Sequence, residues 1–172
     1  MLRVFLIALT TVALLCSACS DNSTGTGDTK PPAGRTRGFT GCKTPLAPLA
    51  HGDYAIGQAC VEYAYDGRSI LQLTHVNGVF NCCPDSVGGE IRITDHSITI
   101  DEAEWLSNPC DCVCPFDVDY EITGLPPGSY TIRVNELYLH EGAALLEITV
   151  DLAVRPSGSF CVERDLPFVG IQ

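Results

Sequence analysis

The stretch Phe116-Asp117-Val118-Asp119-Tyr120-Glu121-Ile122 decides the fold class. Apolar and acidic residues alternate along it, which is the two-residue period of a β-strand with one buried and one solvated face. The strand ends at Leu125-Pro126-Pro127-Gly128, and the alternation resumes in Tyr130, Ile132 and Val134. This pattern predicts two strands separated by a tight corner.

The rest of the chain repeats this period from Tyr54 onward, with Gly, Pro, Asn and Asp at intervals of about ten residues. We expect hairpin turns at Asp66-Gly67 and Asp95-His96, and a further strand over Leu146–Val154. Only Asp101–Leu106 is compatible with a short helix. Seven or eight such strands over about 130 residues predict an all-β fold, an antiparallel two-sheet sandwich stapled by disulfides.

The segment Ile122–Val134 resembles the corner of transthyretin-like and carboxypeptidase-regulatory-like sandwich domains, in which a Gly-Leu-Pro-Pro-Gly turn precedes an aromatic residue. A longer combination is similar to a group of exported, cysteine-rich bacterial proteins; it joins Leu73–His75, Phe80–Pro84 and Cys110–Cys114 to this corner. The resemblance implies an immunoglobulin- or transthyretin-like sandwich. It implies no activity, because such sandwiches host many functions.

The composition limits the partners that the chain can bind. Its 172 residues carry a net charge of −11, and 45% of them are hydrophobic. One domain with a core is expected. The acidic balance repels phosphate backbones and anionic lipid surfaces, so we expect no nucleic-acid partner.

The N-terminus has the features of an export signal. Arg3 precedes the apolar run Val4–Leu15, which is shorter than the roughly 20 residues of a membrane-spanning helix. The following Leu15–Cys19 resembles the lipobox of bacterial lipoproteins, which implies cleavage of residues 1–18 and acylation of Cys19, for example with palmitate. Cys16 departs from the Leu usual in that motif. An ordinary secretory signal is the alternative, and both export the protein.

Residues after Cys19 are expected to form a tether. Ser20–Gly41 is rich in Ser, Thr, Gly, Asp and Pro and has no apolar period, so we predict disorder over residues 19–41 and a folded domain over 42–172. By the sorting rule of enterobacterial lipoproteins, Ser20 implies an outer-membrane location.

Eight cysteines remain after Cys16 and Cys19 are assigned to the signal and the lipid, and an even number in an oxidising compartment predicts disulfides. Same-face neighbours on a strand lie about 6.5–7 Å apart, at the edge of disulfide reach, so Cys110, Cys112 and Cys114 each need a partner elsewhere. Of several compatible pairings, we expect Cys42 with Cys60, Cys82 and Cys83 each with one member of that trio, and the third member with Cys161.

A metal centre is the alternative for the same cysteines. Cys82, Cys83, Cys110, Cys112 and Cys114 would bring five thiolates together, with His75 as a further ligand, and soft ligands of this kind suit Cu(I) or Zn(II). The spacing matches no common zinc motif, and thiolates outside the cytoplasm tend to oxidise, so disulfides are favoured. We interpret His75 as a hydrogen-bonded core or rim histidine.

Other polar residues give weaker indications. The carboxylates of Asp117, Asp119 and Glu121 could contribute to a calcium site, but a solvated strand face is favoured because no calcium-binding loop accompanies them. Paired acids beside an aromatic residue, as near Trp105, are a feature of carbohydrate-active sites, but we favour the interpretation that these acids cap or solvate a short helical turn. They are Asp101, Glu102 and Glu104. Three further histidines, His51, His96 and His140, stand near an acid or a serine but in no hydrolase motif.

The sequence therefore predicts a cell-envelope lipoprotein that presents one β-sandwich as a binding or structural module. We expect no enzymatic activity and no cofactor. The expected partners are the membrane, through the lipid at Cys19, and an envelope protein or glycan that meets loop and edge surfaces of a monomer. The alternatives are envelope metal binding through the cysteine cluster and a hydrolase that uses the acids near Trp105.

Overall fold

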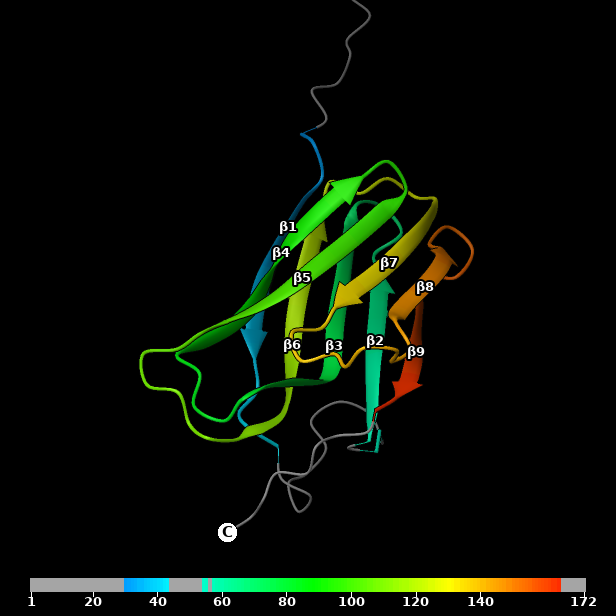
Figure 1. Cartoon of the computed structure of the whole chain (residues 1–172). Helices are drawn as coiled ribbons and strands as arrows, with labels where there is room; N and C mark the ends of the chain where they lie inside the picture. The colour runs from blue at the N-terminus through cyan, green and yellow to red at the C-terminus, as the bar shows by residue number, and fades with distance from the viewer. Residues whose placement is uncertain (1–29, 44–53, 56, 165–172) are drawn as a thin grey trace, which may run out of the picture.

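The computed structural model in Figure 1 describes residues 30–43, 54–55 and 57–164. Within these ranges the chain forms nine β-strands and no helix. The strands are β1 (Ala33–Phe39), β2 (Gln58–Tyr65), β3 (Ile70–Asn81), β4 (Ser86–Thr94), β5 (Ser97–Trp105), β6 (Val113–Thr123), β7 (Ser129–Asn135), β8 (Leu146–Asp151) and β9 (Ser157–Glu163). The predicted all-β class is confirmed.

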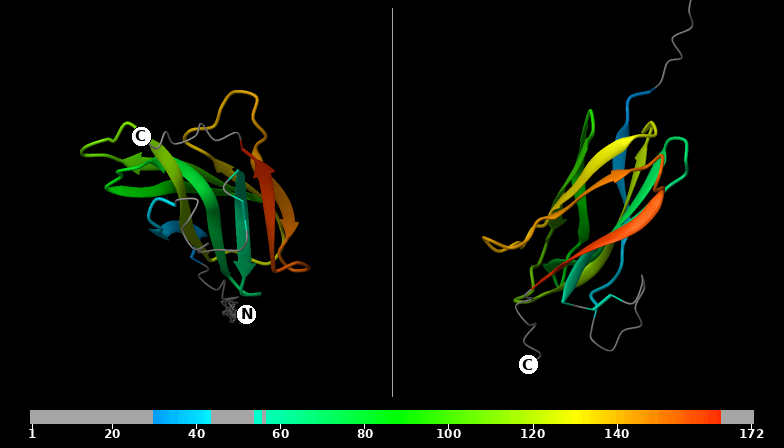
Figure 2. Two further views of the ribbon diagram at one scale, coloured as in Figure 1. Left: turned by 90° about the horizontal axis from the view of Figure 1, so that it is seen from below. Right: turned by 90° about the vertical axis from the view of Figure 1, so that its right-hand side faces the viewer.

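The strands form two sheets that face each other (Figure 2). One sheet has the order β1-β6-β3-β2-β9 and the other the order β4-β5-β7-β8. Neighbouring strands are antiparallel, with the exception of the parallel pair β5 and β7. The predicted two-sheet sandwich is confirmed.

The core lies between the sheets because the apolar residues of each strand share one face. Burial of one large apolar side chain stabilises the fold by about 1.5–3 kcal/mol. The buried side chains include Leu71, Leu73, Phe80, Phe116, Val118, Tyr120 and Ile122 from the five-stranded sheet and Ile98, Ile100, Ile132 and Val134 from the four-stranded sheet.

Both predicted hairpins are present. Thr94 pairs with Ser97, so Asp95-His96 forms a two-residue turn, and Asp95 has a φ of 43°. The turn after β2 is longer than predicted, because β3 starts only at Ile70. The Asp66 carboxylate accepts hydrogen bonds from the backbone N–H groups of Arg68, Ser69 and Ile70, which stabilises this turn.

The predicted short helix over Asp101–Leu106 is wrong, because β5 continues to Trp105. Glu90 pairs with Asp101 and Ser86 pairs with Trp105 on β4. The buried face of β5 runs through Ile98 and Ile100 to Glu102, a polar residue that breaks the apolar pattern in the sequence. The strand predicted over Leu146–Val154 ends earlier, at Asp151, where a turn follows.

Part of the predicted tether is a strand. Ala33–Phe39 forms β1, the edge strand next to β6. The two strands pair from Ala33 opposite Thr123 to Phe39 opposite Val118. Its small and charged side chains give no apolar period, and backbone hydrogen bonds to β6 and polar side-chain contacts hold it in place. The folded domain therefore begins before Cys42. No helix among the described residues is long and apolar enough to cross a membrane.

The acidic face of β6 is not solvated as predicted. Asp117 is fully buried and Glu121 is 8% exposed. The Arg35 and Arg37 side chains of β1 bind the Glu121 carboxylate, and Lys43 forms an ion pair with Asp117. Side chains of β1 and of Lys43, which follows it, cover these two carboxylates, and sequence alternation cannot reveal such cover.

Candidate binding site at one end of the sandwich

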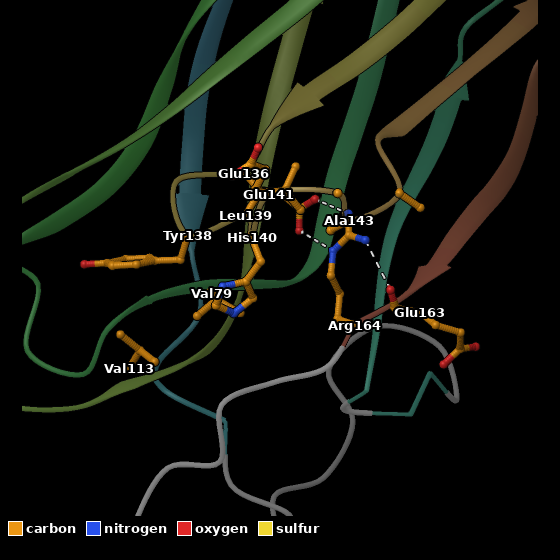
Figure 3. Close-up of a pocket in the computed structure, with 12 residues that line it drawn as sticks. Val79, Val113, Glu136, Tyr138, Leu139, His140, Glu141, Ala143, Glu163 and Arg164 are labelled. Atoms are coloured by element: carbon orange, nitrogen blue, oxygen red, sulfur yellow. Dashed lines mark hydrogen bonds and ion pairs between the residues drawn. The ribbon is translucent and has the colours of Figure 1, made fainter.

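A pocket of about 640 Å³ lies at one end of the sandwich, under the connection between β7 and β8 (Figure 3). The end of β3 and the start of β6 contribute Val79 and Val113, and the end of β9 leads to Arg164. The β7–β8 connection contributes its remaining wall, from Glu136 to Ala144. The pocket is thus built from segments far apart in the sequence.

An ion pair between Glu136 and Arg164 forms one side of the pocket. The Arg164 Nε donates to Glu136 Oε1 at 3.0 Å, and its Nη2 donates to Glu136 Oε2. The Arg164 Nη1 also donates to the Glu163 carbonyl oxygen at 3.1 Å. Both side chains are nearly buried: the exposed fraction is 8% for Arg164 and 7% for Glu136. This fork geometry fixes the β7–β8 connection against the end of β9.

A histidine and two further polar side chains continue this ion pair into the core. The Nδ1 of His75 on β3 lies 2.7 Å from Glu102 Oε1 on β5, and the Tyr120 hydroxyl on β6 donates to the same oxygen at 3.0 Å. The other ring nitrogen, Nε2, lies 3.9 Å from Glu136 Oε1. We call His75, Glu102, Tyr120, Glu136 and Arg164 the buried network. It crosses between the two sheets and reaches the pocket.

The electrostatics of the buried network favour a protonated histidine. Burial lowers the pKa of His75, but the carboxylates of Glu102 and Glu136 together raise it by more, so the pKa lies above its usual range. Burial and the Glu102 carboxylate raise the pKa of Tyr120, which keeps its hydroxyl as a donor. Two cations then balance two carboxylates in the network.

The rim of the pocket is acidic and partly aromatic. Glu141 and Glu163 are exposed there, next to His140. The Tyr138 hydroxyl donates to Glu104 at 2.6 Å, and this hydrogen bond raises the pKa of Tyr138 to about 12. Because Arg164 is already bound by Glu136, the free charges at the rim are mainly negative.

The structure disperses the acids that the sequence places near Trp105. Glu102 belongs to the buried network, whereas Asp101 pairs with Arg92 and Glu104 binds the backbone N–H of Asn81. Trp105 is 55% exposed at the end of β5. Glu102 and Glu104 share one face of β5 and Asp101 lies on the other, together with Trp105. Each carboxylate has a different partner, so they do not form a pair beside the indole ring.

The other polar predictions have separate outcomes. The three carboxylates suggested for a calcium site each have a side-chain partner. Lys43 forms an ion pair with Asp117, the Thr74 hydroxyl donates to Asp119, and Arg35 forms an ion pair with Glu121. The hydrogen bond from Arg35 lowers the pKa of Glu121. His96 lies in the β4–β5 turn, its ring centroid 5.9 Å from that of Tyr130, and His140 lines the pocket. His51 lies outside the described residues.

The expectation of a core histidine is confirmed, and Nδ1 of His75 is hydrogen-bonded, but its Nε2 has no hydrogen-bond partner among the described residues. The partners of His75 were not predictable. The sequence places Glu102 with the acids near Trp105 and not beside His75. Glu136 and Arg164 stand in no sequence motif, because they meet only through the packing of the β7–β8 connection on the end of β9.

All eight cysteines of the domain form disulfides. Cys82 pairs with Cys112 and Cys83 with Cys110, which confirms the predicted bridges to the trio. The predicted pairing of Cys42 with Cys60 is wrong, and so is that of Cys161 with the trio. Cys42 pairs with Cys114, and Cys60 pairs with Cys161.

The strand pairing explains both corrections. Cys60 and Cys161 are directly opposite each other on β2 and β9, with Cα atoms 4.1 Å apart. Cys42 follows β1, which runs antiparallel to β6 and so brings the residue to Cys114 at the start of β6. Neither pairing was predictable without β1 and the position of β9.

The same disulfides bear on the metal alternative. Sulfur atoms of Cys42, Cys82 and Cys114 lie within 4.8 Å of one another because two disulfides pack side by side. Disulfide sulfurs carry no thiolate charge, so in this form they are poor ligands for Cu(I) or Zn(II). His75 does not belong to this group of sulfur atoms, and its Nδ1 contacts Glu102.

Comparison with protein-family models, curated proteins and solved structures finds no match to this chain.

Proposed function

We propose that the protein is a cell-envelope lipoprotein, anchored through acyl chains on Cys19, whose β-sandwich acts as a monomeric binding module rather than an enzyme. The observation that carries this proposal is the position of the pocket relative to the start of the fold. β1 begins at one end of the five-stranded sheet. At that end Thr123, the last residue of β6, pairs with Ala33 at the start of β1 and with Ile70 at the start of β3. The pocket lies at the opposite end, where Asn81 pairs with Val113. The start of β1 and the start of β6 mark these two ends of the sheet in Figure 1.

This arrangement suits a module that faces away from a membrane. A chain from Cys19 to Ala33 would reach at most about 50 Å when fully extended. An anchor at Cys19, in the outer membrane or otherwise in the envelope, would therefore be attached at the Ala33 end of the sandwich, and the pocket would lie at the end farther from the attachment point.

The chemistry of the pocket favours a cationic group on an apolar stem. Glu141 and Glu163 supply negative charge at the rim, while Val79, Val113 and Leu139 supply apolar walls. A lysine or arginine side chain of an envelope protein has both features. The net charge of −11 would speed the approach of such a partner. A protein partner is therefore favoured over a glycan.

The anchor is tested by changing the acylated residue. Cys19→Ala should abolish labelling by a palmitate analogue and release the protein from the detergent phase, whereas Cys16→Ala should leave both unchanged. A Cys19→Ala variant that is still labelled and still partitions into detergent would overturn the lipid anchor.

The ligand class is tested with three small probes. N-acetyl-arginine amide should bind, whereas N-acetyl-citrulline amide, its neutral counterpart, and a neutral oligosaccharide should bind at least about tenfold more weakly. Glu141→Gln together with Glu163→Gln should weaken binding of the cationic probe, and Glu90→Gln, a neutralisation on β4 outside the pocket, should not. Equal binding of the arginine and citrulline probes would contradict a cationic ligand.

A further inference from the structure

A lysine, an asparagine and an aspartate meet on the face of β6 that points away from the core. Asp117 is in β6, which lies between β1 and β3 in the sheet. Lys43 follows β1, and the pairing with β6 continues past the strand end, since the Thr40 N–H donates to the Asp117 carbonyl and the Lys43 N–H donates to the Pro115 carbonyl. Asn77 is in β3, at the register shift between His75 and Gly78.

The contacts among the three side chains are close. The Lys43 Nζ lies 2.9 Å from Asn77 Oδ1 and forms an ion pair with Asp117 Oδ1. The Asn77 backbone N–H donates to the same carboxylate oxygen at 3.1 Å. Asn77 has a φ of 62°, a conformation that asparagine tolerates better than most residues and that is often retained at functional sites.

The amide nitrogen of Asn77 is held as firmly as its oxygen. Its Nδ2 donates to the carbonyl oxygens of Ala55 at 3.0 Å and Gln58 at 2.8 Å. These two bonds fix the amide plane and direct Oδ1, and with it the carbonyl carbon Cγ, toward the lysine amine. The two carbonyls also favour any positive charge that develops on Nδ2.

The group is almost completely removed from water. The exposed fraction of the Lys43 side chain is 8% and that of Asp117 is 0%, and Asn77 is 2% exposed. The second oxygen of Asp117, Oδ2, has no hydrogen-bond partner among the described residues. A buried ion pair is costly to desolvate, and transfer of the ammonium proton to the carboxylate removes both charges and leaves a neutral, nucleophilic amine.

We propose that Lys43 and Asn77 form an intramolecular isopeptide bond, with Asp117 as the catalytic residue. Asp117 accepts a proton from Nζ, and the amine attacks the Asn77 carbonyl carbon. Asp117 then delivers this proton to Nδ2 and accepts a second proton from Nζ. The Cγ–Nδ2 bond breaks, and the released ammonia takes the second proton from Asp117 and leaves as ammonium. One amide replaces another, so the step needs no oxidant, metal or cofactor, and the carboxylate is regenerated.

The bond would join β1 to β3 across β6. β1 is an edge strand that backbone hydrogen bonds attach to β6, and the Cys42–Cys114 disulfide lies one residue before Lys43. An isopeptide bond, unlike the disulfide, survives reduction. It would therefore keep β1 attached to the sheet when the N-terminal side of the chain is pulled, and this role does not depend on what the pocket binds.

Peptide mass spectrometry of the full-length protein tests the bond directly. After reduction, alkylation and digestion, the wild type should yield one branched peptide that contains both Lys43 and Asn77 and is lighter, by one ammonia, than the two separate peptides together. The bond after Lys43 should resist trypsin. The chain has only one other lysine, Lys30, so Lys30→Arg is a matched control that should retain the branched peptide.

Two variants identify the reacting groups. Lys43→Arg keeps the positive charge but lacks a nucleophilic amine, and Asp117→Asn keeps the side-chain shape but lacks the base; both should lose the branched peptide. Because the wild-type digest needs no variant to fold, it decides the proposal on its own. Separate, unmodified Lys43 and Asn77 peptides from the wild type would overturn the proposal.

The neighbouring Gly78 makes a second source of ammonia loss possible, and the same digest separates it. An Asn-Gly sequence can close to a succinimide, which also releases ammonia but joins no second peptide. A linear Asn77 peptide that has lost ammonia in the wild type, with no branched peptide, would show this reaction and would also overturn the isopeptide bond.

Discussion

The Nδ1 atom of His75 lies 2.7 Å from Oε1 of Glu102, and this contact joins the two sheets inside the core. Tyr120 binds the same oxygen from the five-stranded sheet, and Glu136 approaches the other ring nitrogen of His75 from the pocket. A polar chain thus runs from the centre of the sandwich to the candidate binding site. The stability of the fold and the shape of the pocket should therefore depend on the same few residues.

Loss of the histidine should destabilise the fold strongly. His75→Ala leaves the buried Glu102 carboxylate with only the Tyr120 hydroxyl, and removing one partner of a buried charged pair costs about 3–5 kcal/mol. Urea denaturation measures the change in unfolding free energy. His96→Ala, in the exposed β4–β5 turn, is the control and should cost less than about 0.5 kcal/mol. Equal effects of the two substitutions would contradict the role given to the buried network.

The same histidine should make stability depend on pH. The folded-state pKa of His75 lies above its unfolded value of about 6.5, because Glu102 and Glu136 outweigh burial and the nearby Arg164 cation. Its contribution is fully present below pH of about 6.5 and is lost as pH rises through the folded-state pKa. The difference in unfolding free energy between wild type and His75→Gln should therefore shrink as pH rises from 6 through the folded-state pKa. A difference that grows with pH would contradict a charged His75.

The disulfides should stabilise the domain according to the loops that they close. The Cys60–Cys161 disulfide spans 101 residues and the Cys83–Cys110 disulfide spans 27. Loop entropy alone predicts that removal of the first, by a double Cys→Ala substitution, costs about 1 kcal/mol more than removal of the second. Thermal unfolding measures both, and a greater loss from the Cys83–Cys110 pair would contradict the connectivity.

Thiol titration separates disulfides from the metal alternative. The purified domain should show no titratable thiol under denaturing conditions and no stoichiometric zinc or copper by elemental analysis. Reduction should remove the cooperative unfolding transition, because several bridges are lost together. Free thiols together with bound metal that chelators remove would instead support the cysteine cluster as a metal site.

The sequence predicts those features that local alternation determines. The strands β6 and β7, the Asp95-His96 turn and the inward direction of Phe116 and Tyr120 follow from a two-residue period and turn residues. β1 was missed because an edge strand held by backbone hydrogen bonds needs no apolar period. The strand over residues 101–105 was not predicted, because Glu102, the residue that continues the buried face of β5, is polar.

The sites depend on contacts between distant segments, which a single sequence does not reveal. Glu136 and Arg164 form an ion pair although neither stands in a motif. Lys43, Asn77 and Asp117 come together only because β6 lies between β1 and β3. Asp117 was expected on a solvated face, and its burial by Lys43 gives it its proposed chemistry.

The most direct test of the central claim is to locate where a cationic probe binds on the sandwich. In a nuclear magnetic resonance titration with N-acetyl-arginine amide, backbone shifts should change around Val79, Val113 and the β7–β8 connection. Residues near Thr123 and Ile70, at the end where β1 begins, should not change. Shifts confined to that other end, or no saturable shifts up to millimolar probe, would contradict a binding module whose pocket faces away from its anchor.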